Sequence, residues 1–127
     1  MFLKPMLRES SRQWSLIDLA TQRVIAPVVE AAFDSRTRKK GLLGRASLKG
    51  SALVIAPCSA VHTFFMRFAI DVVFADREGQ VVKICHQVGP WRIAAAWRAF
   101  AAIELEAGAA EAAGLSIGSS ITLRASD

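Results

Sequence analysis

The chain has 127 residues, of which 53% are hydrophobic, and its formal net charge is +5 at pH 7. This length predicts a single domain that needs neither a disulfide nor a structural metal to fold. No uncharged apolar run is long enough to cross a bilayer, and the N-terminus lacks the apolar core of a secretory signal. We therefore expect a cytoplasmic protein without a membrane partner, whose Cys58 and Cys85 are reduced thiols. The bias toward Arg over Lys is typical of a GC-rich bacterial genome.

The first part of the chain predicts a leader and two extended segments. Residues 1–12 are largely polar and are interpreted as a loose leader, so we place the single domain at 13–127. In residues 14–19, one set of side chains (Trp14, Leu16 and Asp18) alternates with a second set (Ser15, Ile17 and Leu19). This alternation is typical of a strand. The apolar run at 23–33 is also predicted to be extended, with Pro27 marking a bulge or a strand edge.

The rest of the chain predicts two short helices among further strands. Asp34 or Ser35 can cap a first helix, which Gly41 or Gly44 would end. β-Branched and aromatic residues predict the remaining strands. These strands are expected at 51–57, 69–76, 81–88, 100–106 and 120–126, with a hairpin turn at 76–80 and an alanine-rich helix at 107–115. The pattern predicts a mainly β fold of the α+β class, either a small β-sandwich or a partly closed barrel with two short helices.

Basic residues are concentrated in the first third of the chain. Residues 1–45 carry nine Lys or Arg and four Asp or Glu, whereas residues 46–127 carry seven of each. The excess charge can attract nucleic acid or another anion, and the segment 36–45 is the candidate site. No aromatic residue is interleaved with these charges, and no helix-turn-helix or zinc pattern is present. We therefore do not expect nucleic acid to be the main partner.

The segment 57–76 places polar groups inside an apolar run. Cys58, His62 and Met66 are spaced by four residues, and Arg67 and Asp71 have the same spacing. This spacing puts side chains on one face of either a strand or a helix. The first three residues are therefore expected to share a face, and the Arg/Asp pair lies on the other face if the segment is extended. Both a binding site and a core with satisfied polar side chains are consistent with this pattern.

Cysteine and histidine also raise the question of catalysis or metal binding. A nucleophilic pair needs the Cys58 thiol within about 3–4 Å of the His62 ring, but a straight strand separates the two residues by about 13 Å. A turn would have to bring them together, and no third group that orients the histidine is identifiable. Cys85 and His86 are further nitrogen and sulfur donors, but adjacent strand residues face opposite sides. We expect no metal and no cofactor, and we favour a non-enzymatic role.

Three motifs occur in an order that resembles one known family. They are KKGLLGRASL at 39–48, PCSAVHTFFMRFAIDVVFADREGQVVKI at 57–84 and IELEAGAAEAAGLSIG at 103–118. The chain resembles the bacterial and archaeal family called domain of unknown function 192, from about residue 23 to residue 123. The resemblance implies a small β-rich domain of the sandwich type. It implies no reaction and supplies no catalytic residues.

The resemblance also implies that several charged and polar residues recur at fixed family positions. We predict a small non-catalytic β module that binds a small ligand or a partner protein through a groove. The predicted binding residues are His62, Met66, Arg67, Asp71, Arg45 and Glu104. One alternative is an enzyme of acyl or thiol chemistry that uses Cys58 and His62. A second alternative is anion or nucleic-acid binding through the segment 36–45.

Overall fold

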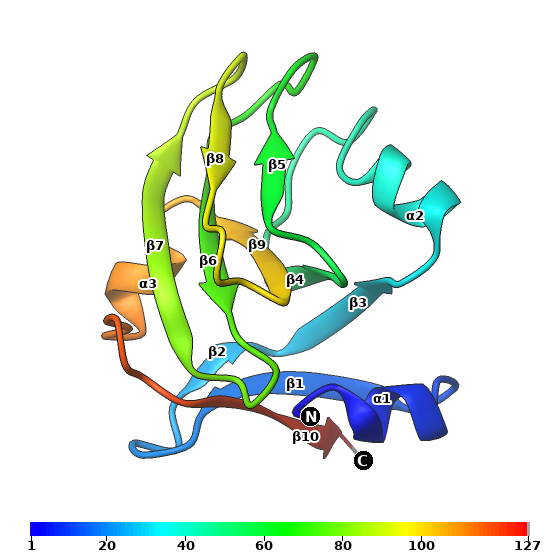
Figure 1. The fold of residues 1–127 in the computed structure, drawn as a ribbon, viewed down its shortest axis with the longest axis vertical. Coiled ribbons are helices and arrows are strands. Elements are labelled where there is room, and N and C mark those ends of the chain that lie inside the picture. Colours follow the sequence, from blue (N-terminus) through cyan, green and yellow to red (C-terminus); the bar gives the residue numbers. More distant parts are fainter. Residues whose placement is uncertain (127) are drawn as a thin grey trace.

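Ten strands and three short helices make up residues 1–126, the part of the chain that the computed structural model describes (Figure 1). In chain order they are α1 Lys4–Arg8, β1 Gln13–Asp18, β2 Val24–Ala26, β3 Val28–Ala32, α2 Ser35–Lys40, β4 Ser51–Ile55, β5 Ala60–His62, β6 Ile70–Ala75, β7 Val81–Val88, β8 Ile93–Ala95, β9 Ala101–Glu106, α3 Ala109–Ala112 and β10 Ile121–Ser126. The prediction of a mainly β fold is confirmed. The strands form three sheets that do not close on themselves. None of the helices in residues 1–126 has the length and hydropathy of a membrane span.

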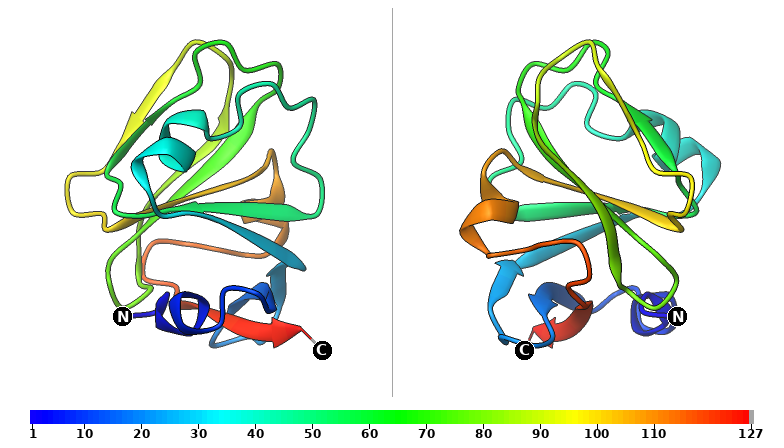
Figure 2. Two further views of the ribbon diagram at one scale, coloured as in Figure 1. Left: turned by 90° about the vertical axis from the view of Figure 1, so that its right-hand side faces the viewer. Right: turned by 60° about the vertical axis from the view of Figure 1, so that its left-hand side comes forward.

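A five-stranded sheet in the order β3-β4-β9-β6-β7 forms the centre of the molecule. Only β3 and β4 pair in parallel, and the other neighbouring pairs are antiparallel. The three-stranded sheet β10-β1-β2 lies beside the central sheet, and the two-stranded sheet β5-β8 extends toward the opposite end of the molecule (Figures 1 and 2). Every residue of β6 is buried, which explains its nearly continuous apolar sequence.

The central sheet has a hydrophobic core on each of its two faces. Val54, Val73 and Ile103 belong to the core that the three-stranded sheet also contributes to. Their neighbours along the same strands, which include Val72 and Ala102, belong to the second core. Because side chains alternate along a strand, Glu104 faces the side of Ala102. The alternation of β9 therefore directs a carboxylate toward the second core.

The N-terminal residues differ from the predicted loose leader. They form α1, and Phe2, Leu3 and Met6 are buried in the first core. The backbone N–H of Phe2 also donates a hydrogen bond to the carbonyl of Arg77. The polar composition of the segment obscured these three apolar residues, of which Phe2 and Leu3 precede α1 and Met6 lies within it. The chain therefore has three short helices rather than the two predicted.

Local sequence signals account well for α2 and for the β6–β7 turn. Asp34 caps α2 by accepting a hydrogen bond from the Thr37 N–H at 2.8 Å, and the helix ends at Lys40 before Gly41. The β6–β7 hairpin turn needs Gly79, because its φ is +85° and a Cβ there would overlap the carbonyl oxygen of Ile121. Both features match the prediction. The three-residue strands β5 and β8 were missed, because such short segments carry little periodic signal.

Candidate functional site

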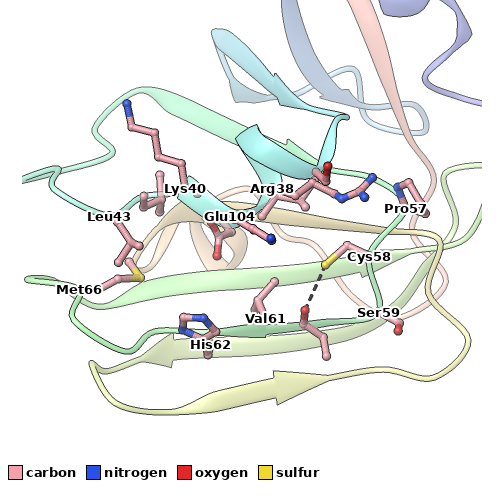
Figure 3. Close-up of a pocket in the computed structure, with 16 residues that line it drawn as sticks. Arg38, Lys40, Leu43, Pro57, Cys58, Ser59, Val61, His62, Met66 and Glu104 are labelled. Atoms are coloured by element: carbon pink, nitrogen blue, oxygen red, sulfur yellow. Dashed lines mark hydrogen bonds between the residues drawn. The ribbon is translucent and has the colours of Figure 1, made fainter.

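A cavity of about 450 Å³ lies between α2, with the loop that follows it, and β5 (Figure 3). Apolar side chains form much of its wall, namely Leu42, Leu43, Ile55, Val61 and Met66. The cations of α2 line another side, and Lys40 extends outward in Figure 3. Small-molecule sites have volumes of roughly 300–1,000 Å³ and combine apolar walls with a few polar groups. The cavity has the size and the lining of such a site.

Glu104 supplies the acidic group of the cavity from strand β9. The residue is only 3% exposed, and within residues 1–126 no group donates a hydrogen bond to its carboxylate. Burial raises the pKa of Glu104 to about 7, against a smaller lowering by the positive charge of Arg45. Within residues 1–126 no fully shielded side-chain oxygen lacks a hydrogen-bond partner, so the oxygens of Glu104 are open to the cavity. Glu104 therefore offers the cavity an acidic group to which no donor of the described chain is bonded.

Arg45 does not neutralise Glu104 directly, because Glu30 holds its guanidinium. The two guanidinium nitrogens donate to the two carboxylate oxygens of Glu30, one of them at 2.8 Å. This hydrogen bonding is the largest cause of the lowered pKa of Glu30 and of the raised pKa of Arg45. The bidentate geometry is the one that arginine and carboxylate groups prefer. Arg45 therefore acts on Glu104 only through the field of its charge.

Cys58 and His62 both line the cavity but are not hydrogen-bonded to each other anywhere in the described chain. The Cys58 thiol donates to the carbonyl of Ala60 at 3.2 Å. Burial is the main cause that raises the pKa of this thiol, and the charge of Glu104 raises it further. His62 is exposed, and its Nδ1 accepts a hydrogen bond from the backbone N–H of Phe64 at 3.3 Å. Burial therefore favours the neutral thiol of Cys58 over a nucleophilic thiolate, although a backbone hydrogen bond at Ala60 acts in the opposite direction.

The structure gathers only part of the predicted groove. Cys58, His62, Met66 and Glu104 surround one space (Figure 3), although the segment that carries the first three is not one regular element. The residues that line the cavity do not include Arg67, Asp71 or Arg45. The first three residues were expected to lie together and do so, and Glu104 reaches them through the pairing of β9 with β4 and β6.

Asp71 is fully buried and binds three backbone N–H groups. Its Oδ1 accepts from Gln87 at 2.8 Å, and its Oδ2 accepts from Gly108 and Ala110 at 3.1 and 3.0 Å. Arg67 is exposed, and no ion pair joins it to Asp71 within residues 1–126. Asp71 thus fastens the β7 end and the start of α3 to β6, which is a structural role.

The basic segment contributes to the cavity, which spacing alone did not predict. Arg38, Lys39 and Lys40 line it, and Arg38 also donates to the carbonyl of Phe33 at 3.1 Å. The only sequence signal for this arrangement was the Asp34 cap, which places a short basic helix directly after β3. Within residues 1–126, no three His, Cys, Asp or Glu side chains are grouped so that they could hold a metal ion.

Comparison with known proteins identifies relatives of uncharacterised function. The sequence model of the domain of unknown function 192 family, described as an uncharacterized ACR, matches residues 18–123. A crystal structure described as that of a proposed transcription regulator from Sinorhizobium meliloti 1021 is similar, with a TM-score of 0.75 at 20% identity, over 90% of this chain and 92% of that one. A protein of unknown function from Novosphingobium aromaticivorans DSM 12444 gives a TM-score of 0.71 at 19% identity, over 86% and 82% of the two chains. These structures share the fold, and no curated protein matches the sequence.

Proposed function

This chain belongs to the domain of unknown function 192 family, and we propose that it is a non-catalytic module that binds a small molecule in the cavity around Glu104. The observation that carries the proposal is the buried carboxylate of Glu104, which has no hydrogen-bond donor in the described chain. A ligand that donates a hydrogen bond would offset part of the desolvation that raises the pKa of this carboxyl group. His62, Met66 and Cys58 complete the lining of the proposed site.

The chemistry around Glu104 favours a ligand with an N–H or O–H donor. Two possible donors already have partners: the Cys58 thiol donates to the carbonyl of Ala60, and the Arg45 guanidinium donates to Glu30. The carboxylate accepts hydrogen bonds when it is ionised and can donate one when it is protonated. A pKa of about 7 makes both forms available near neutral pH. An amine, amide or hydroxyl group is therefore the expected anchor of the ligand.

The rest of the cavity favours a small, partly apolar molecule. Leu42, Ile55 and Val61 offer apolar surface beside the carboxylate. Lys39 and Lys40 line the side next to them and are exposed, so an anionic group on the ligand would be attracted there. The basic segment then contributes to the same site rather than forming a separate one. Arg67, Asp71 and Arg45 have no direct role in this proposal.

A thiol-based reaction is less favoured by the same geometry. Nucleophilic cysteines have lowered pKa values and a base within hydrogen-bonding distance. The pKa of Cys58 is raised instead, and its thiol donates a hydrogen bond to the carbonyl of Ala60 rather than to a base. We therefore propose binding rather than acyl or thiol chemistry.

Thermal unfolding in the presence of small molecules tests the proposal. A panel would pair compounds that differ in one group, an amine or hydroxyl donor in the first and the same group with every N–H or O–H replaced by methyl in the second. We expect only donor-bearing compounds to raise Tm, and Glu104→Leu to abolish the increase. Glu106→Gln is the matched control, because Glu106 lies two residues along β9 and is exposed. Stabilisation that survives Glu104→Leu would contradict the proposed site.

A further inference from the structure

Two loops at one end of the molecule expose apolar side chains to solvent. They are the β5–β6 loop, residues 63–69, and the β7–β8 loop, residues 89–92. Both lie at the end opposite the two chain termini in Figures 1 and 2. Phe65 is 70% exposed and Trp91 56%, and Ile93, the first residue of β8, is 69% exposed. We call these loops together with Ile93 the apolar tip.

Thr63 fastens the two loops of the apolar tip to each other. Its hydroxyl donates to the carbonyl of Gly89 at 2.6 Å and accepts from the N–H of Arg92 at 2.9 Å. Its backbone N–H donates to the Arg92 carbonyl, and its carbonyl accepts from the N–H groups of Trp91 and Met66. Thr63 is 1% exposed, so this bonding is shielded from water. The tip is therefore a rigid unit rather than two independent loops.

The backbone of the tip holds its aromatic residues in an unusual conformation. Phe65 and Trp91 have φ angles of +66° and +65°, which residues other than glycine rarely adopt. Their rings contact each other at a centroid distance of 4.6 Å, and Phe64 stacks on Trp91 at 5.7 Å. A strained backbone that presents exposed rings costs folding free energy, and such strain is concentrated at functional positions.

The apolar tip also carries two positively charged side chains. Arg67 and Arg92 belong to the two loops, and both are exposed. The sequence contains no Asp or Glu in either 57–70 or 84–103, the segments that include these loops. The tip therefore combines aromatic and aliphatic surface with cations that no acid of these segments balances.

We propose that the apolar tip docks on an anionic lipid bilayer, with Phe65, Trp91 and Ile93 inserted at the interface and Arg67 and Arg92 near the lipid phosphates. Aromatic and aliphatic side chains enter the interface by burying apolar area, and nearby basic residues are attracted to anionic headgroups. From the lack of a spanning segment we expected no membrane partner. A peripheral contact needs no such segment, and the exposed tip is the observation that changes this expectation.

Two other occupants fit the observations less well. A second copy of the chain would bring the arginines of both tips together, and like charges at an interface are unfavourable. Single-stranded nucleic acid needs free ring faces for its bases, whereas Phe64 covers one face of Trp91 and the exposed Ile93 offers no ring. A projecting, partly aliphatic surface with flanking cations fits a bilayer best. The proposal is independent of ligand binding at Glu104.

Sedimentation with vesicles tests the proposal on the full chain. We expect binding to vesicles of phosphatidylcholine and phosphatidylglycerol in a 3:1 ratio, and much weaker binding to pure phosphatidylcholine or in high salt. The double variant Phe65→Ala/Trp91→Ala should reduce the partition coefficient by roughly tenfold or more. Trp97→Ala is the matched control, because Trp97 is 88% exposed, contacts Arg98 and follows β8 at its other end. This control should bind like the wild type.

Several results would overturn the proposal. They are equal binding by the double variant, an equal loss in Trp97→Ala, and no binding to anionic vesicles. Size-exclusion chromatography and single-stranded oligonucleotide binding would show whether the tip serves self-association or nucleic acid instead, and either finding without vesicle binding would replace the lipid proposal. Equal thermal unfolding of the variants confirms that they are folded, and retained ligand binding at Glu104 would separate a failure of this inference from a failure of the proposed function.

Discussion

Arg45 and Glu30 hold each other through two hydrogen bonds, and within residues 1–126 no cation forms an ion pair with Glu104. A buried carboxylate beside an arginine would ordinarily form an ion pair with it. Here Arg45 is hydrogen-bonded to Glu30, and Glu104 lines the cavity. The arrangement keeps the pKa of Glu104 near neutrality rather than low.

Removing the charge of Arg45 should raise the pKa of Glu104 above 7. Burial alone raises this pKa, and the charge of Arg45 is the opposing effect. Titration of the Glu104 carboxyl carbon by NMR in Arg45→Met measures the change, with Glu104→Gln used to assign the resonance. Arg124→Met, which removes an exposed arginine of β10, is the control for a general loss of charge. An unchanged or lowered pKa in Arg45→Met would contradict the electrostatic account of the cavity.

Glu104→Leu should stabilise the protein at high pH but not at low pH. The folded state raises the pKa of Glu104 from 4.5 to about 7, so it binds the proton more tightly than the unfolded chain does. The cost of ionising Glu104 is therefore absent below pH 4.5, grows between pH 4.5 and 7, and is constant above that range. The gain from Glu104→Leu should be about 3 kcal/mol larger at pH 8 than at pH 4. Urea unfolding at the two pH values gives this difference, and a gain that does not depend on pH would contradict it.

Asp71→Asn should destabilise the fold strongly, whereas Arg67→Ala should have little effect. Asparagine keeps one acceptor oxygen where Asp71 uses two oxygens for three N–H groups. We expect a loss of about 2–4 kcal/mol in the free energy of unfolding for Asp71→Asn. For the exposed Arg67 we expect a change within about 0.5 kcal/mol. Similar losses in both variants would instead indicate the structural Arg/Asp pair that the sequence allowed.

Cys58 should react slowly with iodoacetamide near neutral pH. Its raised pKa leaves little thiolate, which is the reactive form. Mass spectrometry of a Cys85→Ser protein follows Cys58 alone, and the same protein unfolded in guanidinium provides the reference rate. We expect the folded protein to react several-fold more slowly. A faster reaction in the folded state would support the thiol-enzyme alternative.

Local sequence signals predicted the elements better than the way they assemble. The Asp34 cap, the Gly79 turn and the apolar run of β6 each depend on a few neighbouring residues, and each was predicted from the sequence. Cys58, His62 and Met66 were expected to lie together and do line one cavity, but they lie in β5 and in the loops on either side of it, so a spacing of four in one regular element does not explain their grouping. Glu104 joins this group only through long-range strand pairing, in which it lies opposite Leu53 of β4 and Val72 of β6, and no local pattern encodes that pairing. The burial of Phe2 against the β6–β7 turn was missed for the same reason.

The most direct test of the central claim is native mass spectrometry of the protein after incubation with a small-molecule extract of bacterial cells. Glu104→Leu, the control Glu106→Gln and the wild type would be compared under the same conditions. We predict that the wild type and Glu106→Gln retain a small molecule with an amine, amide or hydroxyl group, and that Glu104→Leu retains none. The same bound mass on all three proteins, or no bound small molecule on the wild type, would contradict the proposal that the cavity around Glu104 is a ligand site.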